Sequence, residues 1–247
     1  PTPGALPRTR STQPGHPEPS RTEHSVVEEG GIAEFRFPHP GILNTPARPK
    51  QPIVGMDLGT TRSSVAVVEN NEVLVLQARN GLWDIPSVVG FTEVGDPVVG
   101  TDAREMFIID PNHAIISPKR LLGRKYQERD LEAYLAGMAM AHSEGPNGEV
   151  LVHPRGKSLT IPQVCAPLLF SMRVMAQEFL DQQVTDVVLT IPVSYDEYRR
   201  KAIRDAASLA GLRVLDFIEE PTAAVLAHHF DSSFRGLVAV YDFGGGT

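Results

Sequence analysis

The chain has 247 residues, of which 41% are hydrophobic, so it can bury a substantial core in one or two domains. It holds 30 acidic residues against 23 lysines and arginines, a formal net charge of −7, which argues against nucleic acid as a general partner. No apolar run reaches the length of about 18 residues that a membrane span needs. A single cysteine, Cys165, excludes an internal disulfide and a metal site built from several cysteines.

Proline and polar residues dominate the first part of the chain, residues 1–52. This leader holds 11 of the 21 prolines, so we expect it to be disordered, without a packed fold. Its first 17 residues carry no acid, as in organelle transit peptides, but glutamates follow and no apolar stretch is present. Together with the single cysteine, these features lead us to expect a cytoplasmic protein, with a transit peptide as the minor alternative.

Short β-branched stretches separated by turns predict a strand meander from residue 53 onward. The predicted strands are Ile53–Asp57, Ser64–Glu69, Glu72–Gln77 and Pro86–Phe91, with Asn70-Asn71 as a tight turn. Apolar alternation at Val65, Val67, Val73 and Val75 fits these strands. Thr101–Ile109 should form a short helix that Pro111 ends, and Asn147-Gly148 the turn of a second hairpin. We interpret residues 91–160 as an inserted subdomain.

After residue 160 the apolar spacing predicts alternating helices and strands. One face of a helix over Pro162–Leu180 carries Val164, Leu168, Met172, Met175 and Phe179. The next predicted elements are a strand at Val187–Ile191, a helix at Asp196–Ala210 capped by Gly211, a strand at Leu212–Ile218, a helix from Glu220 and a strand at Leu237–Tyr241. A meander followed by this alternation predicts an α/β fold with a mixed sheet and flanking helices.

One pattern occurs twice, 185 positions apart: a strand that delivers an aspartate to a turn of glycine and threonine. The copies contain Asp57, Gly59, Thr60 and Thr61 and, at the end of the chain, Asp242, Gly244, Gly245, Gly246 and Thr247. Glycines let backbone N–H groups approach phosphate oxygens, threonine hydroxyls add donors, and an aspartate at a strand end can hold hydrated Mg²⁺. The pattern therefore predicts a nucleotide polyphosphate site, although neither copy has Walker or dinucleotide-loop spacing.

Six motifs occur in the order found in a known family. They are VGMDLGTT (54–61), IPSVV (85–89), KRLLGR (119–124), AGL (210–212), EPTAA (220–224) and DFGGGT (242–247). From about Ile53 to Thr247 the chain resembles the ATPase domain of 70-kDa heat-shock (DnaK-type) chaperones. The resemblance implies an actin-like, ribonuclease H-like ATPase fold of two lobes with ATP and Mg²⁺ between them, of which residues 53–247 would form the first lobe.

The resemblance also implies roles for individual residues. Asp57, Asp242 and Glu220 would bind Mg²⁺ through water, and Gly59, Thr60, Thr61, Gly244, Gly245, Gly246 and Thr247 would surround the β- and γ-phosphates. Lys119 would lie at the γ-phosphate and position the attacking water, because an ammonium can stabilise developing negative charge. Lys119, Asp242 and Glu220 are therefore the expected catalytic residues. A glutamate at a helix start also favours the helix dipole, and that explanation of Glu220 is compatible with metal binding.

Two further residues match an allosteric pair. Pro192 and Arg200 correspond to the proline and arginine with which the family passes the nucleotide state to its peptide-binding domain. The resemblance further implies unfolded peptides, a J-domain co-chaperone and a nucleotide exchange factor as partners. Neither nucleic acid nor a membrane is an expected partner.

Four positions depart from the family pattern. Arg62 stands where a neutral residue is usual, Ser194 replaces an aromatic residue, and Glu219 replaces an asparagine. At Asp216 the family has an arginine that helps to engage J-domain co-chaperones, so the charge at this position is inverted. We expect this protein to use a specialised co-chaperone or to couple weakly to ordinary ones.

Two other classes of the same superfamily share some of these features. An actin-like filament-forming ATPase also has phosphate turns and a Glu-Pro-x-Ala-Ala motif, but the 119–124 motif and the hairpin at 146–148 favour the chaperone. A sugar kinase needs a carboxylate base facing a substrate hydroxyl, and no residue of this chain is assigned to that role. The chain begins at Pro1 and stops within a glycine turn, so we expect a fragment without its second lobe and substrate-binding domain. By itself it should bind nucleotide weakly and have no useful turnover, so that the fragment alone is inactive as an enzyme.

Overall fold

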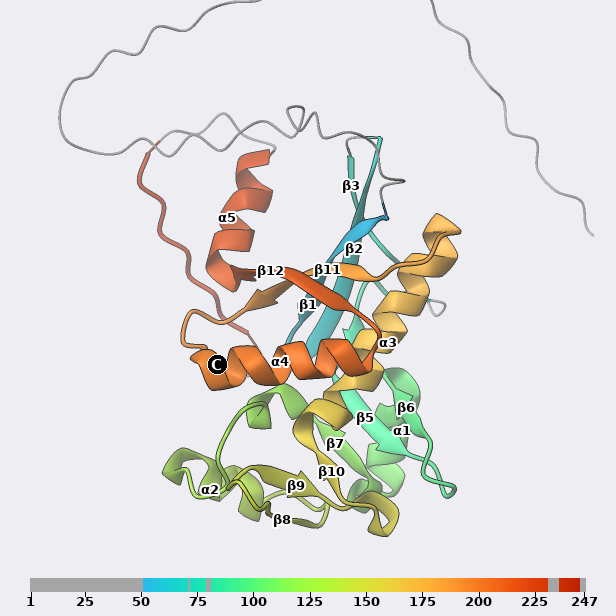
Figure 1. Cartoon of the computed structure of the whole chain (residues 1–247), viewed down its shortest axis with the longest axis vertical. Coiled ribbons are helices and arrows are strands. Elements are labelled where there is room, and N and C mark those ends of the chain that lie inside the picture. The colour runs from blue at the N-terminus through green and yellow to red at the C-terminus, as the bar shows by residue number, and fades with distance from the viewer. Residues whose placement is uncertain (1–50, 71, 79–80, 231–235, 245–247) are drawn as a thin grey trace, which may run out of the picture. The chain divides into compact units, whose positions relative to one another are not determined.

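A six-stranded mixed sheet forms the centre of the described structure, a computed structural model that covers residues 51–70, 72–78, 81–230 and 236–244 (Figure 1). The strand order is β12-β11-β1-β2-β3, with β4 paired to β2. The strands are β1 (Ile53–Leu58), β2 (Arg62–Glu69), β3 (Glu72–Val75), β4 (Ile85–Pro86), β11 (Asp186–Ile191) and β12 (Arg213–Glu219). Strands β1, β11 and β12 are parallel, whereas β2 and β3 are antiparallel, so the predicted mixed sheet is confirmed.

Helices pack against this sheet. Helix α3 (Ile161–Leu180) contacts β1 and β2, α4 (Glu197–Leu209) contacts β12, and α3 packs on α4. Val164, Leu168 and Met172 of α3 are fully buried, as the predicted periodicity requires, but Phe179 of the same predicted face is half exposed near the end of the helix. Helix α5 (Glu220–Phe230) contacts β11 and β12. Among the described residues, no helix is both long and apolar enough to cross a membrane.

The region predicted as an inserted subdomain contributes to two small antiparallel sheets, drawn below the main sheet in Figure 1. One has the order β6-β5-β7 and the other β10-β9-β8. Their strands are β5 (Val88–Phe91), β6 (Pro97–Val99), β7 (Ala114–Ile116), β8 (His142–Glu144), β9 (Val150–Val152) and β10 (Leu159–Thr160). The helices of this region are α1 (Thr101–Ile109), η1 (Pro111–His113), η2 (Pro118–Leu121), α2 (Arg129–Ala136) and η3 (Pro154–Gly156). Helix α3 connects the two levels, because it also contacts β5 and β6.

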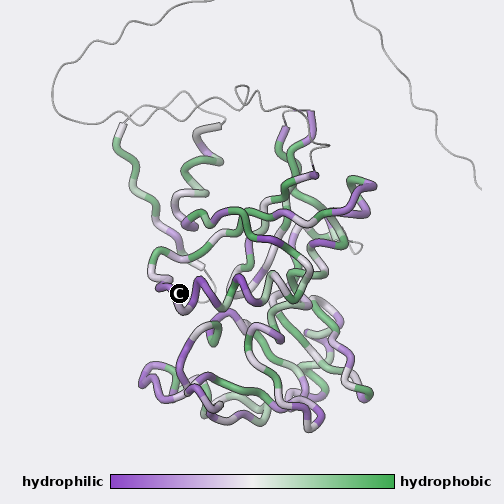
Figure 2. The backbone as a smooth tube through the Cα atoms, in the orientation of Figure 1, coloured by the Kyte–Doolittle hydropathy of each residue, from purple (hydrophilic) through white to green (hydrophobic). Residues whose placement is uncertain are grey.

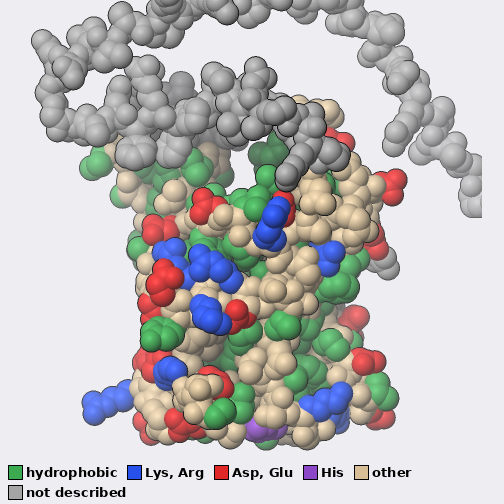
Figure 3. All heavy atoms as spheres, viewed as in Figure 1, with side chains coloured by type: hydrophobic (Ala, Val, Ile, Leu, Met, Phe, Trp, Pro, Cys, Tyr) green, Lys and Arg blue, Asp and Glu red, His purple; other side chains and the backbone are tan. Residues whose placement is uncertain are grey.

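Hydropathy follows this arrangement. Green, hydrophobic stretches run through the strands in Figure 2, whereas many peripheral turns are purple. On the face drawn in Figure 3, basic and acidic side chains are interspersed over α4 and β12. This face therefore presents no continuous basic surface of the kind that nucleic acid prefers.

Some predicted strands differ from the structure. Val65 and Val67 are buried, but Val73 and Val75 of β3 are about half exposed, because β3 is an edge strand whose register places both on the outward face. The predicted strand Pro86–Phe91 is divided at Ser87, with β4 in the main sheet and β5 in a small one. The predicted strand Leu237–Tyr241 is wrong: these residues are exposed and pair with none of the described strands, and a strand needs such a partner for its backbone hydrogen bonds.

Other predictions lie partly or wholly outside the described residues. This applies to residues 1–50 of the leader, to Asn71 of the predicted turn and to residues 245–247 of the second phosphate turn. Asn70 has the left-handed φ of 51° that a tight turn can require.

Helix α4 ends in a glycine cap at Gly211. The Gly211 N–H donates to the carbonyl of Ser208 at 2.9 Å, and the Leu212 N–H donates to that of Ala207 at 2.8 Å. These two bonds form a Schellman motif, which requires a left-handed residue at the position of Gly211. Its φ of 74° satisfies that requirement without the steric cost of a Cβ.

A side chain from α3 reinforces the same cap. Arg173 donates through Nη1 to the Ala210 carbonyl at 3.0 Å and through Nε to the Val184 carbonyl at 2.7 Å. A Cβ at Gly211 would lie only 2.3 Å from Arg173 Nη1. Any other residue at this position would therefore strain the backbone and displace the arginine.

We predict that Gly211→Ala destabilises the protein by about 1–2 kcal/mol, because alanine is strained at positive φ. The free energy of unfolding, measured in urea, checks this expectation. Gly137→Ala is the matched control: Gly137 caps α2 with a φ of −88°, and a Cβ there would be 3.6 Å from its nearest neighbour. Equal stability of the two variants would contradict the strain argument.

Candidate functional site

Three parallel strands end at the same edge of the main sheet. Because β1, β11 and β12 run in the same direction, their carboxyl ends lie together, which is where ligands commonly bind in α/β sheets. Asp57 lies near the end of β1, Pro192 directly follows β11, and Glu220 directly follows β12. The sheet thus collects predicted site residues that are far apart in the sequence.

Asp57 is fixed by the neighbouring strand. The hydroxyl of Thr190 on β11 donates a hydrogen bond of 2.5 Å to Asp57 Oδ1. The parallel register, with Met56 opposite Leu189, places the two residues side by side. The other carboxylate oxygen faces the turn after β1, since a Cβ at Gly59 would lie 3.5 Å from Asp57 Oδ2. Sequence reasoning missed Thr190, because only the register connects it to Asp57.

The first phosphate turn is closed tightly on itself. A Cβ at Gly59 would lie 2.0 Å from the carbonyl oxygen of Arg62, so a side chain at this position would open the turn. The hydroxyl of Ser87 donates to the Gly59 carbonyl at 2.8 Å and forms a buried contact of 2.9 Å with the Ser63 hydroxyl. Ser87 thus fixes the turn directly, and Ser63 supports Ser87. Neither serine was predicted as a site residue.

Lys119 reaches the same edge from η2. Its side chain is almost fully buried, and Nζ donates to Glu220 Oε1 at 2.6 Å. A buried ammonium needs a charged partner, because its desolvation would otherwise be costly. The structure therefore brings two of the three predicted catalytic residues into one ion pair.

A cavity of about 270 Å³ opens beside this ion pair. Its lining joins Thr60 of the phosphate turn to Lys119 and Pro192. The full lining is Thr60, Lys119, Arg120, Leu122, Arg124, Asp130, Leu131, Tyr134, Pro192, Tyr195 and Arg199. Four cationic side chains and one carboxylate give the cavity a positive balance that suits a phosphate group.

Only the first part of the second phosphate turn belongs to the described structure. Asp242 and Gly244 lie in an exposed segment, and Asp242 forms no hydrogen bond or ion pair with other described residues. Gly245, Gly246 and Thr247 lie outside the described part of the chain. Of the predicted site residues, Asp57, Lys119 and Glu220 therefore lie near the first turn, whereas no contact within the described residues holds Asp242 there.

Of the predicted allosteric residues, Pro192 lies on the turn between β11 and α4, and Arg200 lies near the start of α4. The N–H of Tyr195 donates to the Pro192 carbonyl at 3.1 Å, and Arg200 Nε donates to the Tyr195 carbonyl at 3.1 Å. Pro192 and Arg200 therefore both hold the backbone of one aromatic residue. No pattern in the sequence marked Tyr195 as a site residue.

Two of the four positions that depart from the family pattern, Arg62 and Asp216, form side-chain contacts in the described structure. Arg62, at the end of the first turn, forms an ion pair with Asp84, and its side chain is half exposed. Asp216 is exposed on β12, and its Oδ1 accepts a hydrogen bond of 2.8 Å from the N–H of Phe217. Ser194 is exposed on the turn before α4, and Glu219 ends β12.

The residues at this edge fit the phosphate end of a nucleotide. A turn that only glycine can form, a hydroxyl-bearing residue at its tip and a buried lysine surround a cationic cavity. Within the described residues, no three His, Cys, Asp or Glu side chains cluster closely enough to hold a metal ion directly. Binding of Mg²⁺ through water, with Asp57 and Glu220 as carboxylates, is compatible with that finding.

Cys165 lies on α3 and packs as a small hydrophobic residue, as predicted. Burial raises the pKa of its thiol to about 12, although the nearby Lys119 ammonium acts in the opposite direction. The thiol is therefore protonated and inaccessible in the folded protein.

We predict that Cys165 of the folded protein does not react with a thiol reagent at pH 8 but reacts fully in denaturant. Stability should also fall as the pH rises above about 8.5, because only the unfolded thiol then ionises. Reagent kinetics and urea unfolding across this pH range, with Cys165→Ala as the control for the pH effect, test both expectations. Rapid reaction in the native state would contradict them.

Comparison with models of known protein families agrees with this geometry. The family described as "Hsp70 protein" matches residues 53–247, about four-fifths of the chain. The match starts at β1 and includes both phosphate turns, η2 with Lys119 and the start of α5 with Glu220. The chain belongs to the Hsp70 protein family and is a chaperone of the Hsp70 type, with the actin-like ATPase fold of that family.

Proposed function

We propose that residues 53–247 bind MgATP through its phosphates and contribute to its hydrolysis, which drives cycles of peptide binding and release. One observation carries this proposal: Asp57 and the Lys119–Glu220 ion pair lie at the carboxyl edge of the parallel strands, and Lys119 lines a cationic cavity together with Thr60. An anionic ligand with a bound cation matches both the positive cavity and the two carboxylates.

Each residue has a chemical role in this proposal. Gly59, Thr60 and Thr61 supply backbone and hydroxyl donors to phosphate oxygens. Asp57 and Glu220 hold water molecules of Mg²⁺, which neutralises phosphate charge when it is bound. Lys119 stabilises negative charge that develops on the transferred phosphoryl group and orients the attacking water.

The second turn is part of the same proposal. Asp242 would supply a further carboxylate to the hydrated metal, and Gly244, Gly245, Gly246 and Thr247 further phosphate donors. Asp242 is exposed among the described residues, and we propose that the two turns come together to form the complete site. Approach of the two turns would also exclude water from the phosphates.

We predict that Lys119→Ala lowers the rate of ATP hydrolysis by about 100-fold or more, because it removes charge stabilisation from the transition state. Single-turnover measurements with protein in excess over MgATP can detect even a slow reaction. Lys201→Ala is the matched control, since Lys201 is an exposed lysine on α4 that forms an ion pair with Asp205. Wild-type hydrolysis by Lys119→Ala would overturn the proposed role.

Three further assays, made on a protein that includes the substrate-binding domain, separate the classes of the superfamily. ATP-dependent peptide affinity is expected of a chaperone, ATP-dependent light scattering of a filament, and ATP-dependent sugar phosphorylation of a kinase. We propose that only the first is observed, in a cytoplasmic protein that acts with unfolded peptides and a nucleotide exchange factor.

We further propose weak coupling to ordinary J-domain co-chaperones. Asp216 is exposed on β12, so its negative charge is available to repel an acidic partner surface. The hydrogen bond from the Phe217 N–H leaves the Asp216 carboxylate at the surface.

We predict that Asp216→Arg strengthens binding of a J-domain by about tenfold at low salt, because repulsion becomes attraction. The gain should shrink at high salt, since exposed charges are screened. Equilibrium titration at two salt concentrations measures both effects. Glu93→Arg, at an exposed position between β5 and β6, makes the same change in charge elsewhere. An equal gain in that control would show that only net charge matters.

A further inference from the structure

Lys119 has a second neighbour besides Glu220. Its Nζ lies 5.8 Å from the ring centroid of Tyr195, and Arg199 Cζ lies 5.8 Å from the same centroid. Both distances are within the range of about 6 Å in which a cation is attracted to an aromatic ring. One ring therefore contacts the buried ammonium at the site and a guanidinium from α4.

The position of this ring is fixed from its backbone. Pro192 and Arg200 each hold a backbone atom of Tyr195 through a hydrogen bond of 3.1 Å. Its hydroxyl, in contrast, forms no hydrogen bond within the described part of the chain. Burial raises the pKa of the Tyr195 hydroxyl, so the ring remains neutral at physiological pH. The position of the hydroxyl end of the ring therefore depends on packing against the charged side chains beside it.

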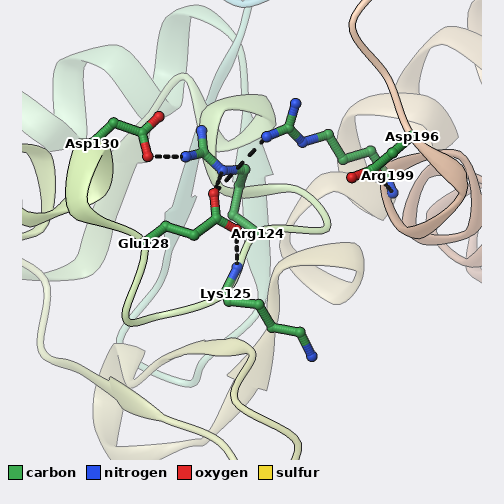
Figure 4. A network of polar contacts seen from close by, with 6 residues as sticks. All are labelled: Arg124, Lys125, Glu128, Asp130, Asp196 and Arg199. Atoms are coloured by element: carbon green, nitrogen blue, oxygen red, sulfur yellow. Dashed lines mark hydrogen bonds and ion pairs between the residues drawn. The ribbon is translucent and has the colours of Figure 1, made fainter.

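Arg199 is itself anchored. Its Nη2 lies 4.0 Å from Glu128 Oε2, and its side chain is only 22% exposed. Figure 4 shows Arg124 and Arg199 both directed toward Glu128, and Lys125 donating its N–H to the same carboxylate, at 2.6 Å. Arg124 also pairs with Asp130 at 2.5 Å. This network attaches the start of α4 to the loop before α2.

The ion pair alone does not fix Lys119. In the proposed function Glu220 also holds a water molecule of Mg²⁺, so its carboxylate has two tasks. The Tyr195 ring has no such competing task, and it lines the same cavity as Thr60 and Lys119. A neutral ring can hold an ammonium in place without removing the charge that phosphate binding needs.

We propose that Tyr195 and Arg199 are positioning residues for Lys119: the Tyr195 ring holds the ammonium at the cavity, and Arg199, anchored by Glu128, holds the ring. This inference rests on the proposed function for the role of Lys119, whereas the contact itself is independent of nucleotide. Neither residue is a catalytic residue, because each acts through its neighbour.

The contact is tested first without nucleotide, by NMR of the whole chain with ¹³C-labelled lysine. The Lys119 methylene signals are assigned by their loss in Lys119→Arg. Ring currents from Tyr195 should displace these signals from those of exposed lysines such as Lys201. We expect Tyr195→Leu to remove the displacement, Tyr195→Phe to keep it, and Arg199→Gln to reduce it while Arg199→Lys retains it.

A second tyrosine provides the matched control. Tyr198 is exposed, and its ring lies 5.9 Å from Lys125 Nζ, so it forms a similar pair outside the cavity. Tyr198→Leu should leave the Lys119 signals unchanged. Unchanged Lys119 signals in Tyr195→Leu would overturn the role of the ring, and unchanged signals in Arg199→Gln would overturn that of Arg199. Should Tyr195→Leu not fold, the two Arg199 variants decide the question.

Single-turnover ATP hydrolysis then separates this inference from the proposed function. We expect Tyr195→Leu to lower the rate by about tenfold with MgATP affinity nearly unchanged, because the lysine is misplaced rather than lost. If the wild-type chain hydrolyses ATP no faster than Lys119→Ala, the proposed function fails while the NMR result still stands. A rate in Tyr195→Leu equal to that of the wild type, with wild-type hydrolysis present, would overturn the positioning role.

Discussion

The parallel alignment of β1, β11 and β12 is the constraint on which the site depends. Parallel strands present their carboxyl ends at one edge, and residues at those ends necessarily become neighbours. Asp57, Pro192 and Glu220 reach that edge from separate parts of the chain. A register change of one residue in β11 would turn Thr190 to the other face and remove the hydrogen bond that fixes Asp57.

The side chains that line the cavity at this edge are mainly cationic, whereas the chain as a whole carries a negative net charge. The protein is acidic as a whole, yet the cavity beside Lys119 gathers three arginines in addition to the lysine. Several of these cations are paired with carboxylates, as Lys119 is with Glu220 and Arg124 with Asp130. Paired cations reduce the desolvation cost of burial and still attract an anion, because their donors are not all used.

Helix α3 packs against both the main sheet, which carries the site, and the smaller sheets. It contacts β1 and β2 on one side and β5 and β6 on the other, and it carries the fully buried Cys165 near Lys119. Packing of a long apolar helix between the two levels makes η2, and therefore Lys119, part of a continuous core. The position of the lysine is thus determined by packing as well as by its ion pair.

The sequence by itself determined the local elements and the type of chemistry. Apolar spacing predicted α3 and α1, the aspartate and glycine turns predicted a phosphate site, and six ordered motifs led to the family. Only the tertiary structure decided which side chains meet. Thr190, Ser87, Tyr195 and Arg199 have no distinctive local pattern, and the strand predicted at Leu237–Tyr241 failed because no neighbouring strand pairs with it. Local patterns reflect backbone conformation, which neighbouring residues control, whereas site geometry depends on register and packing between segments distant in sequence.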